Sequence, residues 1–129
     1  MQTALAAAAL LSVVTGIVHS VLGEWLMFRH LRQGTLVPQL GAPPLRARNI
    51  RILWATWHLA SVFGWAFAAI LFTMAISPEV PLRQLVLHAA IAANAGGAIL
   101  VLVGTRGRHP GWIALGGVGV LTWFALGGA

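Results

Sequence analysis

The sequence contains no cysteine and no aspartate, and its only carboxylate side chains are those of Glu24 and Glu79. Without cysteine the chain can form neither a disulfide nor a thiolate metal site, and thiol redox chemistry is excluded. Hydrolytic chemistry that needs two neighbouring carboxylates is not expected from so few acidic residues. Charge is scarce altogether, because only 8% of the 129 residues are charged. The chain therefore has too few polar groups to cover a surface that faces water on all sides.

Hydrophobic residues make up 59% of the chain, a proportion typical of an integral membrane protein. The basic side chains other than histidine are all arginines, and the net charge is +6. These arginines lie between long apolar runs rather than in a separate basic domain, so we expect them to face anionic lipid headgroups. The expected partners are the lipid bilayer and either another membrane protein or further copies of this chain. Nucleic acid is not an expected partner.

Four apolar runs predict an all-α bundle of four transmembrane helices, which forms a single integral membrane domain over residues 1–129. The predicted spans are about 4–28, 52–76, 82–103 and 112–126. Residues 1–3 carry no basic side chain, and the first run is longer than the apolar part of a signal peptide, so we expect it to be retained. The fourth run is short and rich in glycine, and an alternative with three spans would leave it peripheral.

Arginine is concentrated in two of the three connections between the predicted spans. Residues 29–51 contain five arginines and residues 104–111 contain two, whereas the second connection has only Arg83, close to Glu79. Because positive connections remain on the cytoplasmic side, this pattern predicts that both termini are extracytoplasmic. The predicted location is the bacterial inner membrane.

Polar and small residues follow one side of the first predicted span. At about 100° per residue they share one half of the helix circumference, and the opposite half is hydrocarbon. This polar face consists of Ser12, Thr15, Gly16, His19, Ser20, Gly23 and Glu24. An ionisable side chain at membrane depth is costly unless it faces protein and finds a partner. His19 and Glu24 are therefore predicted site residues, and the small residues predict close packing against another helix.

Two further histidines can join this site. Glu24 and His58 are expected at a similar depth, about 7 to 10 Å below the inner boundary, and His19 is expected one to two turns deeper. His109 is expected at the inner surface, just before the fourth span. In an apolar helical core His19 and His58 can hold haem, and His19, Glu24, His58 and His109 can hold a transition metal. Arg48 and Arg51 are the candidate counter-ions for Glu24.

Other interpretations of the same residues remain open. A histidine inside a membrane can hydrogen-bond across helices to serine or threonine, and a glutamate beside an arginine can be a structural ion pair. Glu24 can also carry a proton. We expect purely structural roles for His88 and Asn94.

Three segments carry a resemblance to known proteins: H-S-V-L-G-E at 19–24, W-H-L-A-S-V at 57–62 and R-H-P-G-W at 108–112. Together they resemble a group of small, uncharacterised bacterial membrane proteins with four helices. This resemblance implies the fold but no particular activity. In length, in number of helices and in having a glutamate in the first helix, the chain is also similar to small multidrug-resistance transporters, although Glu24 lies near the end of its span.

The leading hypothesis for function is an intramembrane histidine and glutamate site that holds haem or a metal. One alternative is a structural or accessory subunit of a membrane complex. Another is a small proton-coupled transporter that uses Glu24. The sequence leaves open whether the protein is an enzyme and which cofactor it binds.

Overall fold

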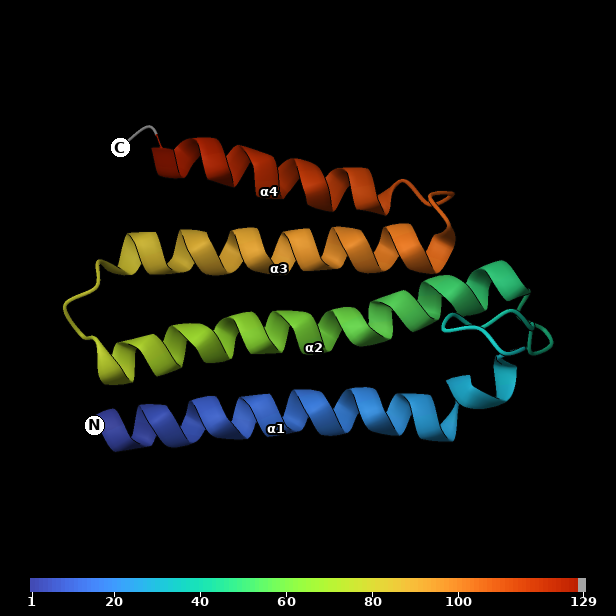
Figure 1. Ribbon diagram of the computed structural model, residues 1–129, viewed down its shortest axis with the longest axis horizontal. Helices are drawn as coiled ribbons and strands as arrows, with labels where there is room; N and C mark the ends of the chain where they lie inside the picture. The colour runs from blue at the N-terminus through green and yellow to red at the C-terminus, as the bar shows by residue number, and fades with distance from the viewer. Residues whose placement is uncertain (128–129) are drawn as a thin grey trace.

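The computed structural model describes residues 1–127, and this part of the chain is helical, with no β-strand. Four α-helices follow one another along the chain, and a short 3₁₀ helix, η1, comes after the first (Figure 1). Their bounds are α1 Gln2–Leu26, η1 Phe28–Leu31, α2 Ala47–Ile76, α3 Leu82–Thr105 and α4 Gly111–Gly127. The prediction of an all-α fold with four helices is therefore confirmed.

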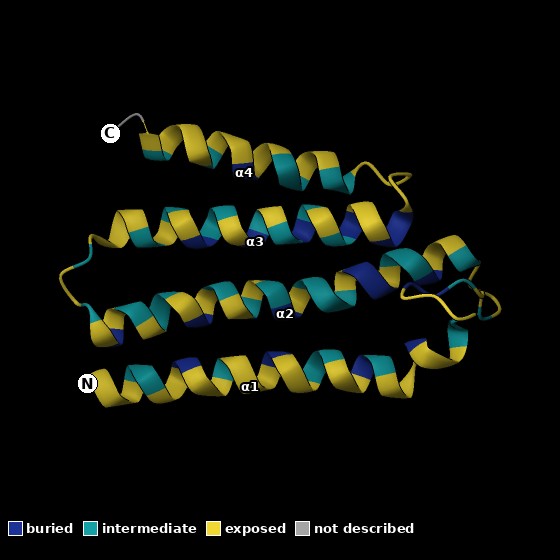
Figure 2. Ribbon diagram, viewed as in Figure 1, coloured by how far each residue is buried: buried dark blue, intermediate teal, exposed yellow. Residues whose placement is uncertain are grey.

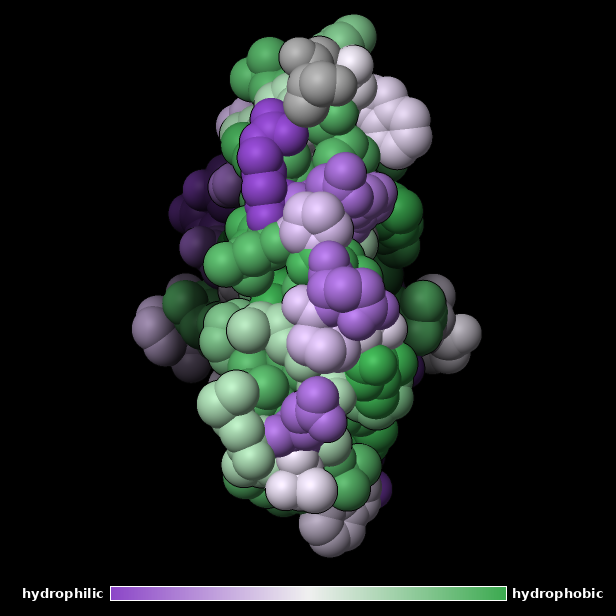
Figure 3. Space-filling view, turned by 90° about the vertical axis from the view of Figure 1, so that its left-hand side faces the viewer, coloured by the Kyte–Doolittle hydropathy of each residue, from purple (hydrophilic) through white to green (hydrophobic). Residues whose placement is uncertain are grey.

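The four helices lie side by side in chain order and do not close into a bundle (Figure 1). Within the described residues, the extensive contacts join α1 to α2, α2 to α3 and α3 to α4. Seen from the end, the molecule is tall and narrow, as a single layer of helices must be (Figure 3). The predicted bundle is corrected in this respect: a closed bundle would bring α4 against α1. Both broad faces of the layer are left open.

Three helices have the length and composition of membrane spans. α1, α2 and α3 contain 25, 30 and 24 residues and are apolar enough to cross a membrane. α4 is apolar but has only 17 residues, which corresponds to about 25 Å of helix. Large apolar side chains are exposed along all four helices, as expected for helices whose outer surface meets lipid (Figure 2).

The helix boundaries differ from the predicted spans mainly at the arginine-rich end, which we define as the end formed by residues 27–46 and 106–110. α2 begins at Ala47, five residues before the predicted start at 52, so Arg48 and Arg51 lie on its first turns. The apolar pattern did not reveal this extension because polar residues occupy those turns. The other end carries the N-terminus, the end of α4 and the connection 77–81 (Figure 1).

The best-packed part of the molecule also lies near the arginine-rich end. Its core consists of Phe28 and Val37 from the first connection, Trp54 and Ala55 from α2, and Val101 from α3. Ala55 is completely buried, and Phe28 is 1% exposed. The first connection therefore folds back on the helices, and this brings its polar residues close to α1 and α2.

Candidate functional site

The α1–α2 interface is built from tryptophans of α2 that lie over glycines of α1. The indole of Trp57 covers Gly23 and that of Trp65 covers Gly16, so closely that a Cβ atom at either glycine would collide with the ring. The Trp57 N–H donates to the carbonyl oxygen of His19 at 2.9 Å, and the Trp65 N–H donates to that of Val13 at 3.2 Å. The predicted small-residue face therefore accepts flat aromatic rings, which set the register of the two helices.

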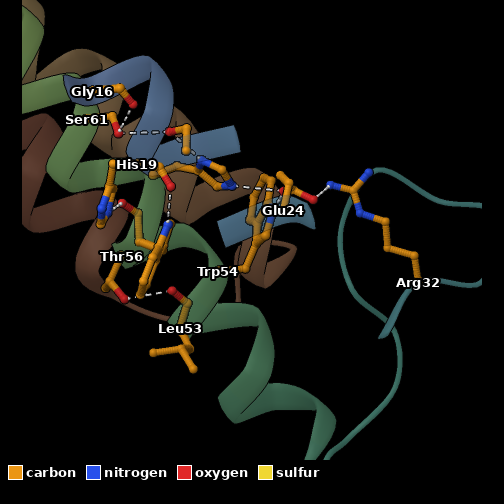
Figure 4. A network of polar contacts seen from close by, with 11 residues as sticks. Gly16, His19, Glu24, Arg32, Leu53, Trp54, Thr56 and Ser61 are labelled. Carbon is orange, nitrogen blue, oxygen red and sulfur yellow. Dashed lines mark hydrogen bonds and ion pairs between the residues drawn. The ribbon is translucent and has the colours of Figure 1, made fainter. Parts of the chain in front are cut away.

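A continuous chain of hydrogen bonds runs along this interface (Figure 4). It begins at Glu24, whose Oε1 lies 2.9 Å from Nε2 of His58. Nδ1 of the same imidazole lies 2.9 Å from the Ser20 hydroxyl. Ser20 donates to Ser61 at 2.8 Å, and Ser61 donates to the Gly16 carbonyl oxygen at 2.9 Å. From Glu24 to Gly16 the chain follows α1 for about 12 Å, a large part of one leaflet.

Three side chains surround the Glu24 carboxylate. Arg32 pairs with Oε2, and the Trp54 indole N–H donates to Oε1 at 2.5 Å, beside the contact from His58. The side chains of Glu24 and Arg32 are 27% and 25% exposed, and that of His58 is 14% exposed. The carboxylate is therefore partly accessible, whereas the imidazole next to it is largely enclosed.

The directions of these hydrogen bonds fix where protons are held. Ser61 uses its only proton on the Gly16 carbonyl, so Ser20 must donate to Ser61, and Nδ1 of His58 must in turn donate to Ser20. One further proton is then needed between Nε2 of His58 and Oε1 of Glu24, because two lone pairs at 2.9 Å would repel. This shared proton joins the His58 ring to Glu24 and completes the hydrogen-bond chain.

His19 directly precedes Ser20 on α1, but its side chain does not join the hydrogen-bond chain. Its ring is stacked on the Trp57 indole, with centroids 4.4 Å apart and planes 7° apart. Its Nε2 lies 3.2 Å from the Trp57 carbonyl oxygen. His19 and Trp57 thus contact each other twice, through the stacked rings and through side chain to backbone bonds in both directions.

The remaining predicted site residues lie elsewhere. His109 precedes α4, where its Nδ1 accepts the Gly111 backbone N–H at 3.1 Å. Arg48 and Arg51, proposed above as counter-ions for Glu24, line a cavity together with His109. The counter-ion that the structure places beside Glu24 is Arg32. His88 and Asn94 bond to carbonyl oxygens of their own helix, those of Gln84 and Ala90.

Two residues of the site, Ser61 and Arg32, were not predicted from the sequence. Ser61 is one turn beyond His58, and this spacing of three residues on a helix could have indicated it. Arg32 could not be found in this way, because it reaches Glu24 only after η1 has turned the chain back.

The structure adds no support for the predicted metal or haem site. In residues 1–127 no group of three or more histidine, cysteine or acidic side chains lies close enough to hold a metal ion. Both ring nitrogens of His58 and Nε2 of His19 are engaged in hydrogen bonds. An iron or other metal would have to displace these partners before it could be ligated.

Two open cavities flank the chain. One, of about 440 Å³, exposes Glu24, Arg32, His58 and Ser20 at the arginine-rich end. The other, of about 470 Å³, lies at the Gly16 end of the hydrogen-bond chain, and its lining is mostly apolar. The polar part of this lining consists of Ser12, Thr15, Gly16, His19 and Ser61. The hydrogen-bond chain therefore connects two spaces.

No family model matches this chain, and neither curated proteins nor solved structures include one similar to it. The resemblance to small four-helix bacterial membrane proteins thus stays a prediction. The helices themselves define the class: the described part of the chain is all-helical, and three of its helices are long and apolar enough to span a membrane.

Proposed function

We propose that this protein is a small proton-coupled membrane protein in which the Glu24 and His58 pair holds the exchangeable proton. The observation that supports this proposal most strongly is the hydrogen-bond chain, in which each contact from Glu24 to Ser61 joins groups that can both give and accept a proton. A structural ion pair needs no such continuation through two serine hydroxyls.

The proposed transfer balances at every step. His58 gives its Nδ1 proton to Ser20, Ser20 gives its own hydroxyl proton to Ser61, and Ser61 gives its proton to a group in the cavity next to Gly16. Meanwhile His58 keeps its Nε2 proton toward Glu24. To restore the starting state, the neutral His58 ring turns so that its protonated nitrogen faces Ser20, the bare nitrogen takes up one new proton through the exposed Glu24 carboxylate, and the two hydroxyl groups rotate back.

The cavity at the Gly16 end of the hydrogen-bond chain indicates the kind of proton acceptor. Its lining is mainly apolar, from residues such as Leu11, Phe67 and Leu71, with the serine hydroxyls and His19 on one side. Such a lining suits an amphiphilic molecule that enters from the lipid with its polar group toward Ser61. We propose that this molecule is the species whose movement or chemistry is coupled to the proton.

The proposed orientation places the arginine-rich end in the cytoplasm and both termini outside, in the bacterial inner membrane. Glu24 then exchanges protons with the cytoplasm, since Arg32 and Glu24 lie at that end.

A second candidate, an accessory subunit of a membrane complex, is favoured by the open layer of helices. A single layer leaves both broad faces without protein neighbours, and copies of this chain or another subunit can pack there. This candidate predicts co-purification with a partner in mild detergent; isolation as a monomer would count against it.

The proposal is tested by proton flux in liposomes that contain the purified protein and an internal pH dye. With a potassium diffusion potential as the driving force, we expect flux from the wild type and at least a tenfold reduction in Glu24→Gln, because the amide cannot release a proton. Glu79→Gln is the matched control, since Glu79 is the other carboxylate and lies in the connection between α2 and α3. Equal flux from Glu24→Gln and the wild type would refute the proposal.

A further inference from the structure

A third cavity, distinct from the two beside the proton site, lies at the arginine-rich end between the start of α2 and the connection from α3 to α4. Its volume is about 580 Å³. The lining residues are predominantly basic or polar and consist of Arg48, Asn49, Arg51, Ile52, Thr105, Arg108 and His109. Three arginines from two separate segments therefore line one cavity.

This concentration of positive charge has no acidic side chain to balance it. The chain has only two carboxylate side chains, and Glu24 is already paired with Arg32 and His58. Glu79 lies in the connection at the other end of the molecule (Figure 1). Like charges held together without a counter-ion are unfavourable, so the cavity is suited to an anion from outside the chain.

Two features of the backbone bring the arginines of these two segments together. Gly104 lets α3 approach α2 closely, because a Cβ atom there would lie 3.1 Å from that of Ala55 and 3.2 Å from the Trp54 ring. Arg106 and Gly107 then adopt left-handed backbone angles, with φ of 54° and 74°, which end α3 in a sharp turn. Arg106 also donates to the Gln39 side chain at 2.7 Å, which fastens this turn to the first connection.

His109 contributes a donor rather than a metal ligand. Its Nδ1 accepts the Gly111 N–H, so any proton on a neutral ring must be on Nε2. The buried Thr105 hydroxyl bonds to the Val101 carbonyl and accepts the His109 backbone N–H, which ties this residue to the end of α3. The cavity therefore offers guanidinium and imidazole N–H groups, the donors that bind phosphate oxygens best.

We propose that this cavity binds a phosphate group, with Arg48, Arg51 and Arg108 as its main ligands. Two sources have this chemistry: the headgroup of an anionic phospholipid, and a free phosphate-bearing anion from solution. A basic pocket between helix ends at the membrane surface is suited to the first source, and its openness to water also admits the second.

The test measures binding to the full-length protein in a neutral detergent. The two probes are phosphatidylglycerol, counted by native mass spectrometry against phosphatidylcholine, and inorganic phosphate, titrated at constant ionic strength. We expect preferential binding of at least one probe and a weakening of about tenfold or more in Arg48→Gln/Arg51→Gln/Arg108→Gln. Phosphatidylglycerol binding that phosphate does not displace identifies the lipid source, and phosphate binding without lipid identifies the soluble source.

The matched control is Arg29→Gln/Arg46→Gln/Arg83→Gln, which removes the same charge from residues that do not line the cavity. This control should retain binding. The single variant Arg108→Gln, in an exposed connection, keeps the test valid if the triple variant fails to fold, and it should weaken binding by itself. Equal affinity in wild type and both cavity variants, or the same loss in the control triple, would overturn the proposal.

Discussion

Single residues explain how the Glu24 carboxylate is accommodated at the end of an apolar helix. Each oxygen of Glu24 has a strong donor: Arg32 at Oε2, and Trp54 and His58 at Oε1. Between apolar helices a carboxylate is stabilised by partners of this kind, which here leave the side chain 27% exposed. His58 has a second hydrogen-bond partner in Ser20, so both members of the Glu24 and His58 pair have further partners.

Much of this site could be predicted at the residue scale, but not its chemistry. Helical spacing placed His19, Ser20 and Glu24 on one face, and depth estimates placed Glu24 and His58 in one layer. The structure adds the atom-to-atom contacts, which depend on side-chain rotamers and on the small offset between two helices. These contacts separate His19, stacked on Trp57, from His58, which is bonded to Glu24.

Ser61→Ala tests the middle of the hydrogen-bond chain. The substitution removes the acceptor of Ser20 and the donor to the Gly16 carbonyl. We expect proton flux to fall at least tenfold, whereas stability in detergent should fall by only about 0.6 to 2 kcal/mol, the usual cost of such bonds in membranes. Thr122→Val is the control, because Thr122 bonds only within α4, to Val118. Unchanged flux in Ser61→Ala would show that protons do not pass through this hydroxyl.

At the scale of helices, the pairing of α1 with α2 depends on rings packed over glycines. Gly16 and Gly23 are seven residues apart on α1, and Trp65 and Trp57 lie on the antiparallel α2 at matching heights. The spacing of small residues predicted close packing, but it could not show that indole rings pack against the glycines. Whether a tryptophan lies at a lipid interface or over a glycine depends on the register between two helices. The sequence pattern of one helix does not reveal that register.

Gly23→Ala should therefore weaken the packing of α1 against α2. The new Cβ would lie 2.6 Å from Cδ1 of Trp57, so the ring must move and its bond to the His19 carbonyl must break. We expect a loss of about 1 to 3 kcal/mol in unfolding free energy, measured by circular dichroism during titration of mixed micelles with dodecyl sulfate. Gly117→Ala, in α4, has nothing within 4 Å of its new Cβ and should be neutral or stabilising. Equal effects of the two substitutions would argue against the packing described.

At the scale of the whole molecule, the arrangement is an open layer and not a bundle. The number of helices followed from the apolar runs, since each run is bounded by arginines, prolines or glycines. Closure could not be predicted, because hydrophobic residues that face lipid and hydrophobic residues that face protein look alike in sequence.

The absence of cysteine makes the proposed orientation directly testable. Single cysteines at Gly34, Glu79 and Leu126 would mark the first connection, the second connection and the end of α4. With a thiol reagent that cannot cross membranes, we expect labelling of intact spheroplasts at the last two positions, and at residue 34 only after permeabilisation. Labelling of residue 126 on the same side as residue 34 would show that α4 does not cross the bilayer.

The measurement that tests the central claim most directly is nitrogen-15 magnetic resonance of labelled histidines in the purified protein. We predict that both ring nitrogens of His58 carry protons, because Nδ1 donates to Ser20 and Nε2 shares its proton with Glu24. In Glu24→Gln the new amide can donate to Nε2, so His58 should become a neutral ring protonated only at Nδ1, while His88, bonded to Gln84, stays unchanged. A neutral His58 beside an ionised Glu24 in the wild type would contradict the account, since one of the four hydrogen bonds from Glu24 to Gly16 would then lack a proton.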